Sequence, residues 1–196
     1  MKTNKIIDEA LSASQCIVSV MGAHAGEESN EIFSRKIEDI ERVNRTFWLI
    51  KSPKAKPELV QKLCYPNSAY AVFIEPATKN GARPATCEQQ ATSFSENGLT
   101  WNPLPKGLGP VTGKLDSKAY ALVFDQMETI HESTEIDLWN YADFSFPEKP
   151  LRLIIGCSTI CATKKEMKEH PEKLKSRFRR IVAVGRLAAP FCVWVR

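Results

Sequence analysis

Short apolar runs alternate with amphipathic stretches along the first 74 residues of the chain. Runs rich in β-branched and aromatic residues predict strands at Cys16–Met21, Thr46–Ile50 and Ala69–Ile74. Apolar positions at helical spacing predict a helix over Glu27–Asn44, and a proline opens a second helical stretch at 57–64. This order of strand, helix, strand, helix, strand predicts a parallel sheet with right-handed crossovers.

The rest of the chain has fewer periodic stretches. A helix is expected over Thr3–Ser14, and strands are expected at Lys118–Met127 and Leu151–Ile155. Near the C-terminus, Ile181–Leu187 and Phe191–Val195 are expected to form a hairpin. We therefore expect an α/β fold: a mixed sheet with a parallel β-α-β-α-β N-terminal part, helices on its faces and a C-terminal antiparallel hairpin.

Three other segments have weaker patterns. Thr163 followed three residues later by Glu166 has the form of a capping box, which predicts a helix start, and a second helix is expected over Glu172–Arg179. Glu128–Asp143 is acidic and is expected to be irregular. Residues 75–117 are rich in proline and glycine and predict a long loop or insertion, with one short helix over Thr86–Ser95.

Length and composition fit one α/β domain over residues 1–196. The chain is 43% hydrophobic and 26% charged, which excludes a disordered tail, a collagen-like chain and a coiled-coil rod. No apolar run approaches the ~20 residues of a membrane-spanning helix. Asp8 and Glu9 interrupt any secretory signal. We therefore expect a soluble cytoplasmic protein without a membrane partner, in which the six cysteines stay reduced.

Charge is distributed unevenly along the chain. From Lys149 to Arg196 there are 12 basic and three acidic residues, whereas the first 148 residues carry 15 basic and 20 acidic residues. Such an asymmetry is typical of an electrostatic face for an anionic partner.

The turn after the first predicted strand is a candidate anion site. Gly22 and Gly26 would let the backbone approach a ligand, and Ser29 could donate a hydrogen bond at the start of the next helix. The spacing matches neither a dinucleotide-binding fingerprint nor a P-loop. Glu27 and Glu28 would repel a phosphate, so a plain turn with acidic helix caps is the alternative.

A second candidate site follows the predicted strand at Leu151–Ile155. Cys157 or Ser158 could be a nucleophile there, since a helix N-terminus lowers the pKa of a nearby thiol. His24 is the candidate base. The alternative is a buried core thiol with turn hydroxyls. Cys157 and Cys161 could also form half a zinc site, but no second close pair of cysteines or histidines is present.

Glu128 and His131 have the spacing of di-metal carboxylate helices, but the motif is not repeated elsewhere in the chain. A solvated acidic loop is the simpler interpretation, and a Mg²⁺ site is the alternative.

The stretch Lys164–Arg180 is strongly basic, with eight Lys and Arg against three Glu. Cationic side chains neutralise phosphates, and Phe178 could stack on a base. The alternative is a solvated helix whose Phe178 and Leu174 face the core. The candidate contacts are Lys164, Lys165, Arg177, Arg179 and Arg180.

Trp101 lies among prolines and glycines in the long loop. It could stack on a ring-shaped ligand or anchor the loop to the core.

The segment Phe47-Trp-Leu-Ile-Lys-Ser-Pro53 resembles the opening strand of EVE/PUA-like domains, which bind modified bases in nucleic acid. The resemblance is confined to these residues. The alternation of strands and helices from Cys16 to Ile74 argues against a small β-barrel of that kind.

Two functions follow from these features. The first is a soluble binding domain for a phosphate-bearing ligand, a nucleotide or nucleic acid, that uses a helix N-terminus and a basic C-terminal face. The second is a small hydrolase or transferase with a Cys or Ser nucleophile. The charge asymmetry favours the first, and the sequence specifies neither a cofactor nor an oligomeric state.

Overall fold

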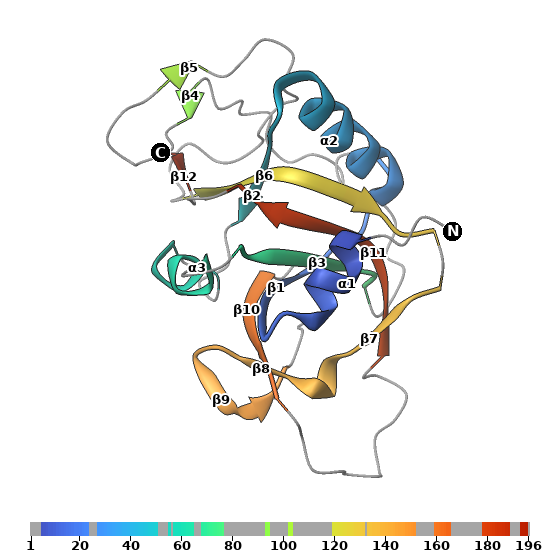
Figure 1. Cartoon of the computed structure of the whole chain (residues 1–196), viewed down its shortest axis with the longest axis vertical. Coiled ribbons are helices and arrows are strands. Elements are labelled where there is room, and N and C mark those ends of the chain that lie inside the picture. The colour runs from blue at the N-terminus through green and yellow to red at the C-terminus, as the bar shows by residue number, and fades with distance from the viewer. Residues whose placement is uncertain are drawn as a thin grey trace.

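One large mixed β-sheet forms the centre of the described structure, and helices pack on its faces (Figure 1). The computed structural model describes residues 5–23, 27–50, 55, 57–64, 68–76, 93–94, 102–103, 119–131, 133–151, 159–165, 178–188 and 193–195. Within these residues the sheet has 10 strands, and its main path runs in the order β12-β6-β11-β3-β1-β10-β8-β9.

Four strands form the centre of the sheet. They are β1 (Gln15–Val20), β3 (Tyr70–Ile74), β10 (Thr159–Lys164) and β11 (Phe178–Leu187). β1 and β3 are parallel, while β10 pairs antiparallel with β1 and β11 pairs antiparallel with β3. The other strands of the sheet are β2 (Thr46–Ile50), β6 (Ala119–Thr129), β7 (Glu135–Asp137), β8 (Tyr141–Asp143), β9 (Phe146–Pro150) and β12 (Val193–Val195). A separate pair consists of β4 (Ser93–Phe94) and β5 (Asn102–Pro103).

The helices are α1 (Lys5–Ser12), α2 (Ser29–Val43) and α3 (Pro57–Cys64), with a 3-10 turn η2 at Leu138–Asn140. Local chemistry defines both ends of α2. Glu28 donates its backbone N–H to Glu31 Oε2 at 2.7 Å, which is one half of a capping box. Asn44 ends the helix in the left-handed region, at φ 59°, and donates its backbone N–H to Ile40 O at 2.7 Å.

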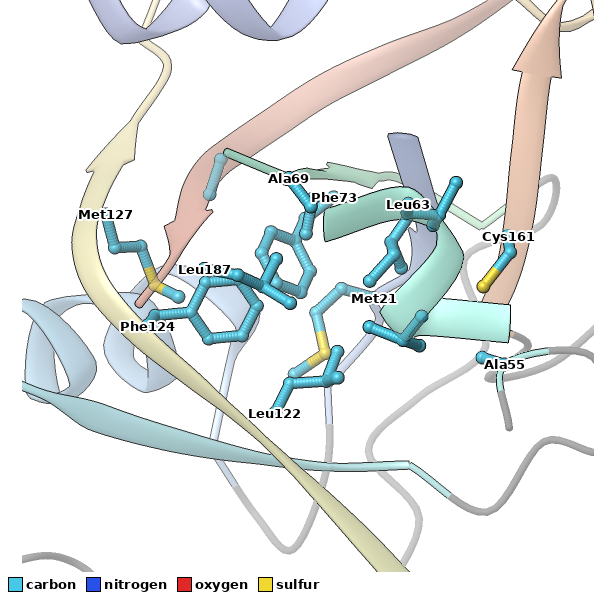
Figure 2. Close-up of a cluster of buried hydrophobic side chains, with 14 of the residues drawn as sticks. Met21, Ala55, Leu63, Ala69, Phe73, Leu122, Phe124, Met127, Cys161 and Leu187 are labelled. Atoms are coloured by element: carbon cyan, nitrogen blue, oxygen red, sulfur yellow. The ribbon is translucent and has the colours of Figure 1, made fainter. Parts of the chain in front are cut away.

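Two apolar layers lie on opposite faces of the sheet. Alternation along β1 sends Cys16, Val18 and Val20 to the face covered by α1, and Ile17 to the face covered by α2 and α3. Figure 2 shows the layer on the α2 and α3 face, where Phe73 of β3, Phe124 of β6 and Leu63 of α3 meet. The sheet is therefore buried on both faces at its centre.

The predicted α/β fold is wrong. Among the described strand pairs only β1 with β3 is parallel, and the sheet is otherwise antiparallel. β2, predicted as the second strand along the chain in the parallel part of the sheet, pairs antiparallel with β6 instead. A continuous apolar run such as Thr46–Ile50 suits any buried strand position, so its pattern does not identify its neighbour.

The predicted C-terminal hairpin is also wrong. Phe124 of β6 pairs with Thr46 of β2 on one edge and with Leu187 of β11 on the other. Tyr120 likewise pairs with both β2 and β12. β11 and β12 therefore follow each other along one edge of β6, and β2 occupies the opposite edge.

Three local predictions are corrected as well. Thr163, the expected helix start, lies in β10, and Phe178 and Arg179, the expected end of a helix, lie in β11. The supposedly irregular acidic stretch contains β7, η2 and β8. Ser93 and Phe94, expected in a helix, form β4. Residues 152–155 and most of the loop at 75–117 lie outside the described residues.

Candidate functional site

Strand register gathers several loops at one end of the sheet. Val20 of β1 is level with Ile74 of β3, and Thr129 of β6 is level with Ala183 of β11, which pairs with Phe73. β1, β3 and β6 therefore end on the same side, which we call the carboxyl end of the sheet. β10 and β11 begin at this end, since they run antiparallel to β1 and β3.

The turn after β1 lies directly beside the turn after β3. Met21 donates its backbone N–H to Ile74 O at 2.9 Å. A Cβ atom placed on Gly22 would lie 3.6 Å from Pro76 Cγ, which is an ordinary contact. Of the other residues predicted for this anion site, Ser29 is half-buried as the first residue of α2. His24 and Gly26 lie outside the described residues.

Carboxylates of the protein itself occupy the N-terminal end of α2. Glu31 accepts the backbone N–H of Glu28, as described above. Glu27 holds Arg35 in a two-point contact, from Arg35 Nη2 at 2.6 Å and from Arg35 Nε at 3.2 Å. The guanidinium therefore offsets the charge of Glu27, which reduces the repulsion that this carboxylate would exert on an incoming anion.

Lys36 lies on the buried face of α2, and no sequence motif predicted a role for it. Its residue exposure is 6%, and it shares this face with Ile32, Phe33 and Asp39. Burial lowers the pKa of Lys36 to about 8, an effect that Asp39 opposes. The sequence did carry a sign of this burial: a lysine and an aspartate lie three residues apart within the apolar stripe of the helix.

Both carboxylate oxygens of Asp39 accept hydrogen bonds from residues other than Lys36. Its Oδ1 accepts a hydrogen bond from Arg42 Nη2 at 2.7 Å, and its Oδ2 accepts one from Thr46 Oγ1 at 3.1 Å. No hydrogen bond or ion pair joins Lys36 Nζ to any residue that the structure describes.

The first residues of β11 bring cations to the carboxyl end. Arg180 Nη1 lies 3.3 Å from Glu75 Oε1, and both side chains are substantially exposed. Arg179 donates from Nη1 to Phe178 O at 2.9 Å, and Phe178 itself is 40% exposed. Arg177 lies in the segment before β11 that the structure does not describe.

Lys164 and Lys165 lie at the opposite end of the strands. Thr163, next to Lys164, pairs with Gln15 at the start of β1. Both ammonium groups bind backbone carbonyls: Lys164 Nζ donates to Leu11 O at 3.0 Å, and Lys165 Nζ donates to Pro147 O at 2.7 Å. The described ends of the basic stretch therefore do not form one continuous track.

The predicted nucleophiles Cys157 and Ser158, like Trp101, lie outside the described residues. The next residue, Thr159, begins β10 at the carboxyl end, where its hydroxyl is 2.8 Å from that of Ser19 and both residues are buried. Cys161 is a buried core residue on the α2 and α3 face. Cys16 is buried on the other face, and burial raises the pKa of its thiol to about 12, which keeps it unreactive.

The described part of the chain holds no cluster of three or more His, Cys, Asp or Glu side chains that could hold a metal ion. Glu128 and His131, whose spacing suggested a metal, contact near neighbours in the chain. Glu128 Oε1 accepts from Gln126 Nε2 at 3.3 Å, and His131 Nε2 lies 3.3 Å from Thr129 Oγ1.

Comparison with protein-family models, with curated proteins and with solved structures finds no match for this chain. None of the helices within the described residues is long and apolar enough to cross a membrane.

Proposed function

We propose that this protein binds a phosphate-bearing small molecule, a nucleotide, at the carboxyl end of β1 and β3. The observation that supports the proposal is the shared position of three features at this end: the Gly22 turn, the start of α2, and the Arg179–Arg180 pair. A turn without bulky side chains admits a ligand close to the backbone, and guanidinium groups bind phosphate oxygens.

The ion pair between Arg180 and Glu75 is compatible with this role. Exposed ion pairs of this kind are worth about 0–1 kcal/mol. A phosphate brings more negative charge and more acceptor oxygens than a carboxylate, so it can replace Glu75 as the partner of Arg180.

A nucleotide fits better than a nucleic acid. A polymer needs a row of phosphate contacts, whereas Lys164 and Lys165 lie at the opposite end of the strands and already bind carbonyls. The proposal includes a cytoplasmic location, where nucleotides are abundant and cysteines such as Cys16 and Cys161, neither of which forms a disulfide, stay reduced.

The test is calorimetric titration with ATP, GTP, AMP and NAD, alongside single- and double-stranded oligonucleotides across a salt series. The double variant Arg179→Ala, Arg180→Ala should weaken nucleotide binding by about tenfold or more. Glu75→Gln should strengthen it by up to about fivefold, because Arg180 loses its internal partner. The matched control Lys164→Ala, at the other end of the strands, should leave it unchanged.

Two results would overturn the proposal: no nucleotide binding even at low salt, or equal losses in the double variant and in Lys164→Ala. Tight, salt-dependent oligonucleotide binding without nucleotide binding would favour a nucleic acid instead.

A second candidate function is a hydrolase or transferase that uses Cys157 or Ser158 as nucleophile and His24 as base. One observation favours it: Ala23 and Thr159, the chain neighbours of His24 and Ser158, belong to segments that meet at the carboxyl end. Labelling with iodoacetamide and with a fluorophosphonate tests it, using Cys157→Ala and Ser158→Ala as the respective controls. Labelling no faster than that of the denatured chain would exclude an activated nucleophile.

A further inference from the structure

Lys36 is a largely buried lysine whose ammonium group has no partner among the described residues. It is 6% exposed, and none of the described residues forms a hydrogen bond or ion pair with its ammonium group. Its Nζ atom is not one of the fully buried polar atoms that lack a partner, so the ammonium end reaches solvent while the rest of the side chain is buried. Lys36 therefore differs from Lys164 and Lys165, each of which has a carbonyl partner.

The carboxylates near Lys36 already accept hydrogen bonds from other residues. Asp39 accepts from Arg42 and Thr46, and Glu27 accepts from Arg35. Asp39 and Glu27 act on Lys36 only through their electric field. The preceding residue has an unused donor of its own, because Arg35 Nη1 is buried and has no hydrogen-bond partner. Two consecutive cations of α2 thus keep N–H groups that no acceptor in the described part of the chain satisfies.

We propose that Lys36 and Arg35 form an anion subsite on α2 that binds an oxygen of the ligand's phosphate group. One phosphate can accept hydrogen bonds from both side chains, since it offers several oxygens. This inference rests on the proposed function for the identity of the ligand, but the two unused donors are observed independently of it.

The position of the two residues agrees with the proposed ligand site. α2 begins after the β1 turn, and helical side chains lean toward the N-terminal end of their helix. Glu27, which ends that turn, is among the groups that act on Lys36. Arg180 would then contact one part of the ligand, while Lys36 and Arg35 bind a phosphate oxygen beside α2.

The experiment uses inorganic phosphate as probe, with chloride at equal ionic strength as reference. Phosphate should raise the thermal unfolding midpoint of the wild-type protein, and the shift should disappear in Lys36→Met. The matched control is Lys62→Met, which replaces an exposed lysine on α3 and should keep the shift. In a ¹³C-lysine NMR titration, phosphate should raise the pKa of Lys36 and leave that of Lys62 unchanged.

An equal phosphate shift in wild type and Lys36→Met, or a Lys36 titration that phosphate does not move, would overturn the subsite. Nucleotide binding that persists unchanged in Lys36→Met would leave the proposed function intact and reject the subsite alone. A phosphate effect on Lys36 without binding of any nucleotide would support the subsite and reject the nucleotide proposal.

Discussion

Gly185 lies where β11 crosses the Phe124 side chain. A Cβ atom there would be 2.7 Å from Phe124 Cδ1 and 3.0 Å from Phe124 Cε1. Phe124 is fully buried and packs against Phe73, with ring centroids 5.9 Å apart, so it has little room to move. The absence of a side chain at Gly185 is therefore a packing requirement of the sheet centre.

Gly185→Ala should lower the free energy of unfolding by about 1–3 kcal/mol, because the added methyl group overpacks the core. Urea denaturation followed by circular dichroism measures the change. Gly22→Ala is the matched control and should change stability far less, since its Cβ would only touch Pro76. Equal effects of the two substitutions would mean that the Phe124 ring moves aside without an energetic cost.

Lys36 gives stability a pH dependence with a definite sign. Its pKa is about 8 in the folded protein, below the ordinary 10.5, so the unfolded chain binds more protons between these values. Stability from this group therefore rises as pH increases from about 8 to 10.5, and is lowest below pH 8. Asp39 and Glu27 oppose this destabilisation, whereas Arg35 adds to it.

Lys36→Met should accordingly stabilise the protein at pH 7 by on the order of 1–3 kcal/mol. The advantage should shrink as pH approaches 10.5, where the wild-type lysine is neutral in both states. Urea midpoints measured from pH 6.5 to 10.5 give the comparison, with Lys62→Met as the exposed control. A pH-independent difference would show that the charge of Lys36 is not responsible.

At the scale of elements, one buried hydrogen bond joins α2 to the strand that follows it. Thr46, the first residue of β2, donates its hydroxyl to Asp39 at 3.1 Å, and both residues are buried. Phe33 and Trp48 stack between the same two elements, with ring centroids 5.6 Å apart. Polar and apolar contacts together set how α2 lies along β2 and β6 (Figure 1).

Thr46→Val should destabilise the protein by about 1–3 kcal/mol, because it leaves Asp39 Oδ2 buried without its donor while keeping the side-chain volume. Thr46→Ser retains the hydroxyl and should cost less. The unfolding free energies of the two variants provide the comparison. A Val variant as stable as the Ser variant would show that the hydrogen bond adds nothing.

Local pattern predicted most elements but not their partners. Thr46–Ile50 and Pro57–Cys64 match β2 and α3 to the residue, because apolar runs and a proline at the first helical turn act locally. Strand pairing depends on contacts between residues far apart in sequence, such as Trp48 with Leu122. The capping-box form at Thr163 was overridden because Thr159–Lys164 pairs with both β1 and β8.

The candidate site was foreseeable only in part. Gly22 and the arginines of β11 have recognisable chemistry, but their meeting at one sheet end follows from register. Lys36 appeared in sequence as an ordinary polar position of an amphipathic helix. Its burial depends on how α2 lies against the sheet, which local pattern does not contain.

At the scale of the whole molecule, β3 and β11 each pair with a strand on both sides, whereas β9 is an edge strand of the sheet. Both faces of this centre are covered by apolar layers. We therefore expect backbone amides there to open only with global unfolding, and those at the margin of the sheet to open locally.

Hydrogen exchange should therefore be slowest in β1, β3 and β11 and fastest, among the strands of the sheet, in β9. Exchange followed by NMR at several urea concentrations tests this ranking. Amides of β3 that exchange as fast as those of β9 would contradict the enclosed position of β3.

The position of β11 also affects how the chain folds during synthesis. β11 lies between β3 and β6, which the ribosome makes earlier. Until β11 emerges, β3 and β6 each have an edge of unpaired backbone groups, and such edges pair readily with other chains. We therefore expect the nascent protein to depend on chaperones until this late strand closes the gap and the sheet forms in one cooperative step.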